Sequence, residues 1–237
     1  MYIQFLVEDI SGEKLINAVM KKYTEESLYP AINYDIKSYR GIGHLKKGKD
    51  ALVVKSEKLL NDLPKRIRAF NSILRNKENA SLFVIVDNDR RETNVFRKQL
   101  AETSSYDNIS LDRVFCIAIE EIEAWLLGDV SAIKSAYPTM KDRISQKHPQ
   151  YKQDEIRHDG TWEFLLELLD TPRRGRTKKA HLAYADLGKL KSEWAERIGV
   201  HMNIRENASP SFNYFICELD KRRQVIYGKW KCQMESE

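Results

Sequence analysis

Carboxylate side chains follow three short apolar runs of this sequence, each at the point where the run ends. Carboxylates gathered at one place repel each other unless a cation is present. Mg²⁺ prefers such oxygen ligands and keeps waters that phosphate oxygens can replace. A bound ion of this kind polarises a phosphodiester and activates water, so the pattern predicts metal-dependent phosphate chemistry. The acids concerned are Glu8, Asp9, Asp87, Asp89, Glu120, Glu121 and Glu123.

The apolar runs read as strands that must bring these acids together. Residues 2–7, 82–86 and 114–119 are apolar apart from Gln4, as strands covered by helices on both faces are. Residues 32–36 instead alternate apolar and polar side chains, which predicts a half-exposed strand at a sheet edge. Segments of helical periodicity separate the runs; they are residues 12–23, about 51–75 and 93–103, with 122–127 after the last run.

This βαβαβαβα order predicts an α/β fold with three αβα layers around a mainly parallel, four-stranded sheet. In an open parallel sheet, ligands bind beyond the carboxyl ends of the strands. We therefore expect the acids to share one rim of the sheet.

The chain changes character after Gly128. Residues 129–160 are polar and carry no clear strand, and later segments have helical periodicity. We expect residues 1–128 to form the α/β core and residues 129–237 to form a mostly helical extension packed on that core.

The composition of the chain mainly argues against certain classes of protein. A net charge of +5 over 237 residues is mildly basic and does not by itself indicate nucleic acid. The three cysteines are far apart and form no CxxC pair, which argues against a disulfide framework or a zinc ribbon and favours a reducing, cytoplasmic setting. The N-terminal run lacks the basic segment of a signal peptide, and no run approaches the roughly 20 apolar residues of a membrane span.

Two basic segments are candidates for holding a phosphate backbone. The first lies beside the Gly41/Gly43 turn after the second strand, where glycines let backbone approach a phosphate closely. The second is the loop at residues 173–179, with five cations in seven residues. Such loops attract phosphate by counterion release, although a solvated charge run is the plain alternative. The residues proposed to bind substrate are Arg40, His44, Lys46, Arg173, Arg174, Arg176 and Lys178.

Each acid also has an ordinary structural interpretation. A lone Asp-x-Asp motif is usually solvated surface or a helix cap, and it is the meeting of three strand ends that favours a site. Glu121 falls on a different face from Glu120 and is the least suited of the three acids to bind metal, and an alternative for Glu123 is an exposed acid beside Trp125. Elsewhere, Ser11 is a candidate N-cap of the first helix.

Aromatic side chains in the second half of the chain favour a packed core over a surface that stacks on bases. They have helical spacing beside other apolar residues, and Cys116 likewise reads as a core residue. Ser209 and Ser211 are candidate caps of the last helix, in a turn that would also fit near the site. The aromatic residues are Trp125, Trp162, Phe212 and Phe215.

Several segments, taken in chain order, resemble the small stand-alone bacterial Toprim-like proteins. These are related to the Toprim domain of topoisomerases, primases and OLD-family nucleases. The resemblance covers nearly the whole chain and implies a Toprim-like core. The matching segments are residues 7–13 (VEDISGE), 40–44 (RGIGH), 86–89 (VDND), 119–126 (IEEIEAWL) and 209–212 (SPSF).

The resemblance also implies roles for single residues. Glu8 matches the Toprim glutamate, a general acid/base or metal ligand, and Asp87 and Asp89 match the two aspartates that bind Mg²⁺ or Mn²⁺. Glu13 stands near the position of an acid that supports a second ion, and Glu120 can add a ligand from the next strand. The spacing of Glu13, and Asp9 in place of a glycine, depart from the common pattern and leave the number of ions open.

The leading hypothesis is therefore a metal-dependent nuclease acting on DNA or RNA, with a role in phage defence suggested by some relatives. The alternative is a non-catalytic effector or sensor subunit that binds nucleic acid or an ATPase partner, since the chain has no Walker A motif of its own. A phospho-receiver is a further rival, because Glu8, Asp9 and Asp87 mimic its acidic pocket. A topoisomerase or primase would need domains for which no segment of this sequence accounts.

Overall fold

The computed structural model describes residues 1–26, 30–43, 58–103, 109–148, 160–169 and 184–234. Its centre is a sheet of β1 (Tyr2–Val7), β2 (Asn33–Ser38), β3 (Ala80–Asp87) and β4 (Asp112–Ala118). The strand order is β2-β1-β3-β4 and every neighbouring pair is parallel. The parallel four-stranded sheet predicted from the sequence is confirmed, with the alternating strand β2 at an edge.

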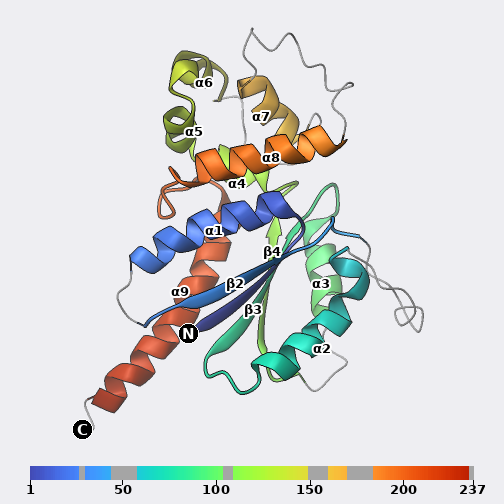
Figure 1. Ribbon diagram of the computed structural model, residues 1–237, viewed down its shortest axis with the longest axis vertical. Helices are drawn as coiled ribbons and strands as arrows, with labels where there is room; N and C mark the ends of the chain where they lie inside the picture. The colour runs from blue at the N-terminus through green and yellow to red at the C-terminus, as the bar shows by residue number, and fades with distance from the viewer. Residues whose placement is uncertain (27–29, 44–57, 104–108, 149–159, 170–183, 235–237) are drawn as a thin grey trace.

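Helices cover both faces of the sheet and give three layers (Figure 1). One face packs against α1 (Ile10–Glu25) and α9 (Pro210–Met234). The other packs against α2 (Leu63–Leu74) and α3 (Thr93–Thr103). Alternation along β1 shows the division, because Phe5 joins the first apolar cluster and Leu6 the second.

The starts of the helices follow local chemistry. Asp9 is the N-cap of α1: its Oδ1 accepts a hydrogen bond from the backbone N–H of Gly12 at 2.8 Å. The prediction that Ser11 caps this helix is therefore wrong, and Ser11 donates to the Asp9 carboxylate instead. Pro64 stands in the first turn of α2, after a short 3₁₀ turn η2 (Leu60–Asp62), as expected for a residue without an N–H.

The second half of the described chain is helical. It contains α4 (Glu123–Leu127), α5 (Val130–Ala136), the 3₁₀ turn η3 (Pro138–Met140), α6 (Lys141–Lys147), α7 (Thr161–Leu169) and α8 (Tyr184–Gly199). Helices α5 and α6 were not predicted, because their polar sequences show little apolar periodicity. Helices α7 and α8 lie in the later part of the chain, where the sequence shows helical periodicity.

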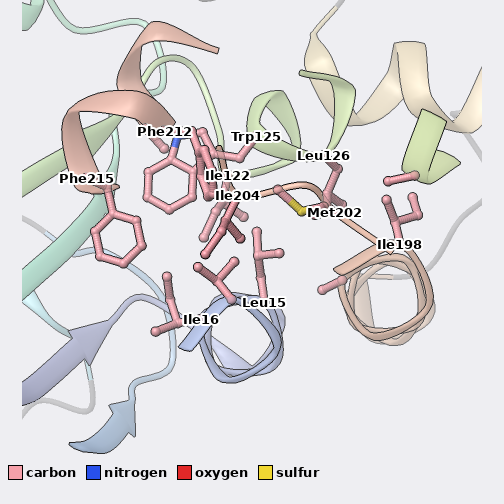
Figure 2. Close-up of a cluster of buried hydrophobic side chains, with 14 of the residues drawn as sticks. Leu15, Ile16, Ile122, Trp125, Leu126, Ile198, Met202, Ile204, Phe212 and Phe215 are labelled. Atoms are coloured by element: carbon pink, nitrogen blue, oxygen red, sulfur yellow. The ribbon is translucent and has the colours of Figure 1, made fainter. Parts of the chain in front are cut away.

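The helical part shares a core with the sheet. Helix α8 lies along α1 (Figure 1), and the approach at Gly199 is so close that an added Cβ would stand 3.0 Å from Ala18 Cβ. Figure 2 shows Leu15 and Ile16 of α1 pointing into a cluster with Ile198 and Met202. The boundary at residue 128 remains a prediction, but the two parts bury apolar surface together.

Trp125 stands at the centre of this shared core. Its ring stacks on Phe215, with centroids 5.4 Å apart, and its indole Nε1–H donates to Ser211 Oγ at 2.9 Å. Ser209 precedes α9, and its Oγ accepts from the backbone N–H of Phe212 at 3.3 Å. The core roles expected for these aromatic residues are confirmed, and Trp162 is partly buried against the same cluster. Cys116 is also fully buried.

A search of the described helices finds none with the length and apolar character that crossing a membrane requires.

Candidate functional site

Glu8 and Asp87 lie next to each other at the point where the sheet topology reverses. The chain passes from β1 to β2 on one side and reaches β3 on the other, and open α/β sheets bind ligands beyond the strand ends at such a reversal. Val7 is in register with Ile85, so Glu8 follows β1 where β3 is ending at Asp87. The backbone of Asp87 is close enough to the Glu8 carboxyl group to lower its pKa.

The environment of Glu8 opposes its ionisation. Burial raises the pKa of Glu8 to about 7, and the charges of Asp9 and Asp89 add to the effect. Backbone N–H groups of Ile42 and Asp87 act in the opposite direction. Glu8 Oε2 is buried and has no hydrogen-bond partner among the described residues. An acceptor left in this state is a place where a cation or a proton is favoured.

Asp87 has the same kind of environment. Burial raises its pKa well above the ordinary range, and the charges of Glu8 and Glu123 raise it further. Lys191 opposes this shift. The carboxylates after β1 and β3 are thus electrostatically coupled to an acid that follows β4, as expected for acids on one rim.

The turns after β3 and β4 are joined and strained. Asp89 has φ +50° and Glu120 has φ +64°, a left-handed backbone that non-glycine residues seldom adopt. The N–H of Asp89 donates to the carbonyl oxygen of Glu120 at 2.7 Å. Glu120 itself is buried, and the Asp89 carboxylate is half exposed and pairs with Arg91 at 2.7 Å.

Glu121, Glu123 and Lys191 form a buried ionic cluster that the sequence did not reveal. Lys191 Nζ lies 3.1 Å from Glu123 Oε2 and 3.4 Å from Glu121 Oε1. Burial and the charge of Glu123 raise the pKa of Glu121 to about 8. Glu123 is only 1% exposed, so its interpretation as an exposed acid is wrong.

A signal for Lys191 was present in the sequence. It falls on the apolar stripe of α8, four residues after Leu187 and three before the buried Trp194. A lysine in such a stripe must pair with an acid if it stays charged. Its candidate partners are acids that also lie in apolar surroundings, such as Glu123 beside Trp125.

Glu13 stands at the edge of the rim, in the first turn of α1, where its carboxylate accepts a hydrogen bond from the hydroxyl of Ser38. Arg40 is exposed in the turn after β2. The N–H of the next residue, Gly41, donates to the carbonyl oxygen of Glu8 at 3.0 Å, so this turn lies on the same rim. Gly41 has φ +95°, which favours glycine.

The remaining residues proposed to hold substrate lie outside the described part of the chain. They are His44, Lys46, Arg173, Arg174, Arg176 and Lys178.

The rim fits a divalent cation in its chemistry but is not arranged as a closed cage. Its donors are carboxylate oxygens, one of them buried without a partner, and their mutual repulsion is the kind that Mg²⁺ or Mn²⁺ relieves. Among the described residues, no group of three or more His, Cys, Asp or Glu side chains is placed to hold a metal ion. Binding would therefore draw the Glu8, Asp87 and Asp89 carboxylates together.

Charged groups at the opposite end of the sheet are already paired. Arg222 of α9 contacts the Asp112 carboxylate through Nε and Nη2, the latter at 2.9 Å, and Glu218 through Nη1 at 2.7 Å. Ser81 also donates to Asp112, at 2.7 Å. Because these bonds satisfy the charges, this cluster serves to fasten α9 to the sheet, and the rim with unsatisfied carboxylates is the candidate site.

Comparison with known proteins gives a family without an assigned activity. No curated protein and no solved structure matches the chain. A family model described as a domain of unknown function (DUF4276) matches residues 7–220, which include the whole acidic rim. The chain therefore belongs to the DUF4276 family.

Proposed function

We propose that this protein is a Toprim-like, metal-dependent hydrolase of nucleic-acid phosphodiesters. The observation that carries the proposal is the pairing of Glu8 and Asp87 at the switch point of the parallel sheet. Both residues are partly buried, the charge of Glu8 raises the pKa of Asp87, and Glu8 Oε2 has no partner among the described residues. Ionisable side chains with strongly shifted pKa values are concentrated at functional sites.

Glu8, Asp87 and Asp89 are the residues proposed to hold Mg²⁺ or Mn²⁺. When bound, such an ion supplies positive charge that polarises a phosphodiester and acidifies water. Glu8 is also placed to accept or return a proton, since burial and neighbouring acids bring its pKa to about 7. The carboxylate of Asp89 is half exposed and lies in a strained turn, so an ion can compete with Arg91 for it.

The other proposed residues would act around this centre. Glu13 and Glu120 remain candidates for a further ligand, one from α1 and one from the turn after β4. Arg40, on the same rim, would hold a phosphate of the strand, together with His44, Lys46 and the 173–179 loop. A substrate of DNA or RNA and a cytoplasmic role in phage defence, beside an ATPase partner, belong to the same proposal.

The alternative is a binding subunit that does no chemistry alone. The observation in its favour is that no three ligand side chains converge on one point within the described ranges. A rim of this kind would be completed only by nucleic acid or by a partner such as an ATPase. The two functions differ in whether purified protein turns over naked substrate.

A cleavage assay tests the proposal. Purified protein is incubated with plasmid, single-stranded DNA and total tRNA, with Mg²⁺, Mn²⁺ or EDTA. Asp87→Asn is the test variant, and Asp142→Asn, which changes an exposed carboxylate of α6, is the matched control. Metal-dependent cleavage lost only in Asp87→Asn supports a nuclease and identifies its substrate. Cleavage that survives in Asp87→Asn contradicts the mechanism, and cleavage of none of the three favours the binding subunit.

A further inference from the structure

The helical part of the chain contributes one cation to the acidic rim. Lys191, from α8, reaches Glu123 at 3.1 Å and Glu121 at 3.4 Å, two of the acids in the segment after β4. Its side chain is 14% exposed, and that of Glu123 is 1% exposed. The pair is therefore shielded from solvent, where an ionic contact is strong and the loss of one partner is costly.

Lys191 faces more acids than one ammonium group can pair with. It contacts the carboxyl groups of Glu121 and Glu123, and it also interacts electrostatically with Asp87. Glu123 Oε1 is buried and, among the described residues, makes no hydrogen bond. Two carboxylates beside Asp87 would otherwise be suitable oxygen ligands for a second divalent ion.

We propose that Lys191 takes the place of a second metal ion, so that the site binds a single divalent ion at Glu8, Asp87 and Asp89. This inference rests on the proposed function and settles its ion count. A lysine ammonium is a compact point charge with three donors, so it neutralises carboxylates much as a small cation does. Lys191 is thereby a positioning residue, because it holds Glu121 Oε1 and Glu123 Oε2 in place.

The arrangement also explains why the helical part accompanies the sheet. Helix α8 lies along α1 (Figure 1), and its Lys191 contacts Glu121 and Glu123, so the rim is electrostatically complete only when the two parts pack together. A site that used two ions would not need this contact.

Mn²⁺ binding to the full-length protein, counted by electron paramagnetic resonance, is the first test. One ion per chain is expected for wild type, and none for Asp87→Asn. Two ions in wild type contradict the role of Lys191, whatever any variant does. No ion in wild type contradicts the proposed nuclease.

Lys191→Met is the second test, because methionine removes the ammonium and keeps much of the volume. The variant is expected to bind one Mn²⁺ more than wild type. Its Tm should rise on Mn²⁺ addition by at least about 5 °C more than the Tm of wild type does. The double variant Lys191→Met/Glu123→Gln removes one charge of each sign and should return to the wild-type count. A Lys191→Met protein that gains neither an ion nor a larger shift contradicts the inference and leaves the proposed nuclease untouched. If Lys191→Met folds neither with nor without Mn²⁺, the number of Mn²⁺ ions bound by wild type decides whether the inference holds.

Discussion

The backbone N–H of Asp89 donates to the carbonyl oxygen of Glu120 at 2.7 Å, and both residues have a positive φ. This bond joins the turns after β3 and β4, each of which carries acids proposed for the site. Strained backbone of this kind persists only where the surrounding structure holds it, and it is concentrated at functional sites.

A pair of substitutions at Asp89 tests whether the turn is held in this conformation. Asparagine adopts positive φ readily, so Asp89→Asn should keep wild-type stability without metal. Valine is β-branched, and Asp89→Val should cost roughly 1–3 kcal/mol. Urea denaturation in EDTA measures both. Equal stability of the two variants would show that the turn relaxes easily.

Glu8 should make the metal-free protein less stable as pH rises. Its pKa is raised to about 7 in the fold, so its contribution is fully present below the unfolded value near 4.5 and is lost as pH passes about 7. The difference is on the order of 3 kcal/mol. Denaturant unfolding in EDTA from pH 4.5 to 8 should show wild type losing stability relative to Glu8→Gln. Parallel pH profiles would contradict the partly buried position of Glu8 beside other acids.

Divalent ions should stabilise the protein more at pH 8 than at pH 6. Burial and like charges raise the pKa values of Glu8 and Asp87, so protons compete with the ion at the lower pH. The Tm shift on adding Mn²⁺ measures this at each pH. Asp142→Asn should behave as wild type does, and a shift independent of pH would point to binding at ordinary surface carboxylates.

Ser211→Ala should weaken the shared core without touching the rim. Trp125 Nε1 donates to Ser211 Oγ at 2.9 Å in a buried setting, and alanine leaves that donor unsatisfied. The expected loss is about 1–3 kcal/mol in urea denaturation. Mn²⁺ binding by the variant should be unchanged. A loss of Mn²⁺ binding would instead place the 209–212 turn in the site.

The sheet was predictable because its strands are short apolar runs between helical patterns. A short apolar run between two helical segments has few structures open to it besides a buried strand. The alternation at residues 32–36 correctly indicated an edge strand. Helices α5 and α6 were missed because their sequences are polar and their few apolar residues, such as Ile133 and Ile144, are spread over two short segments.

The candidate site was predictable only in part. Strand ends are visible in sequence, so the meeting of acids after β1, β3 and β4 follows from the parallel order. The contact between Lys191 and Glu123 joins residues 68 positions apart and depends on how α8 docks. The N-cap role of Asp9 depended on a helix start two residues earlier than the apolar pattern indicated.

Mn²⁺ titration of wild type, Asp87→Asn and Asp142→Asn at pH 8 tests the central claim, that the rim of β1 and β3 holds a divalent ion. The account predicts saturable binding in wild type and in Asp142→Asn, and its loss in Asp87→Asn with the fold intact by circular dichroism. Binding to Asp87→Asn as tight as to wild type, or no binding to wild type, would contradict it.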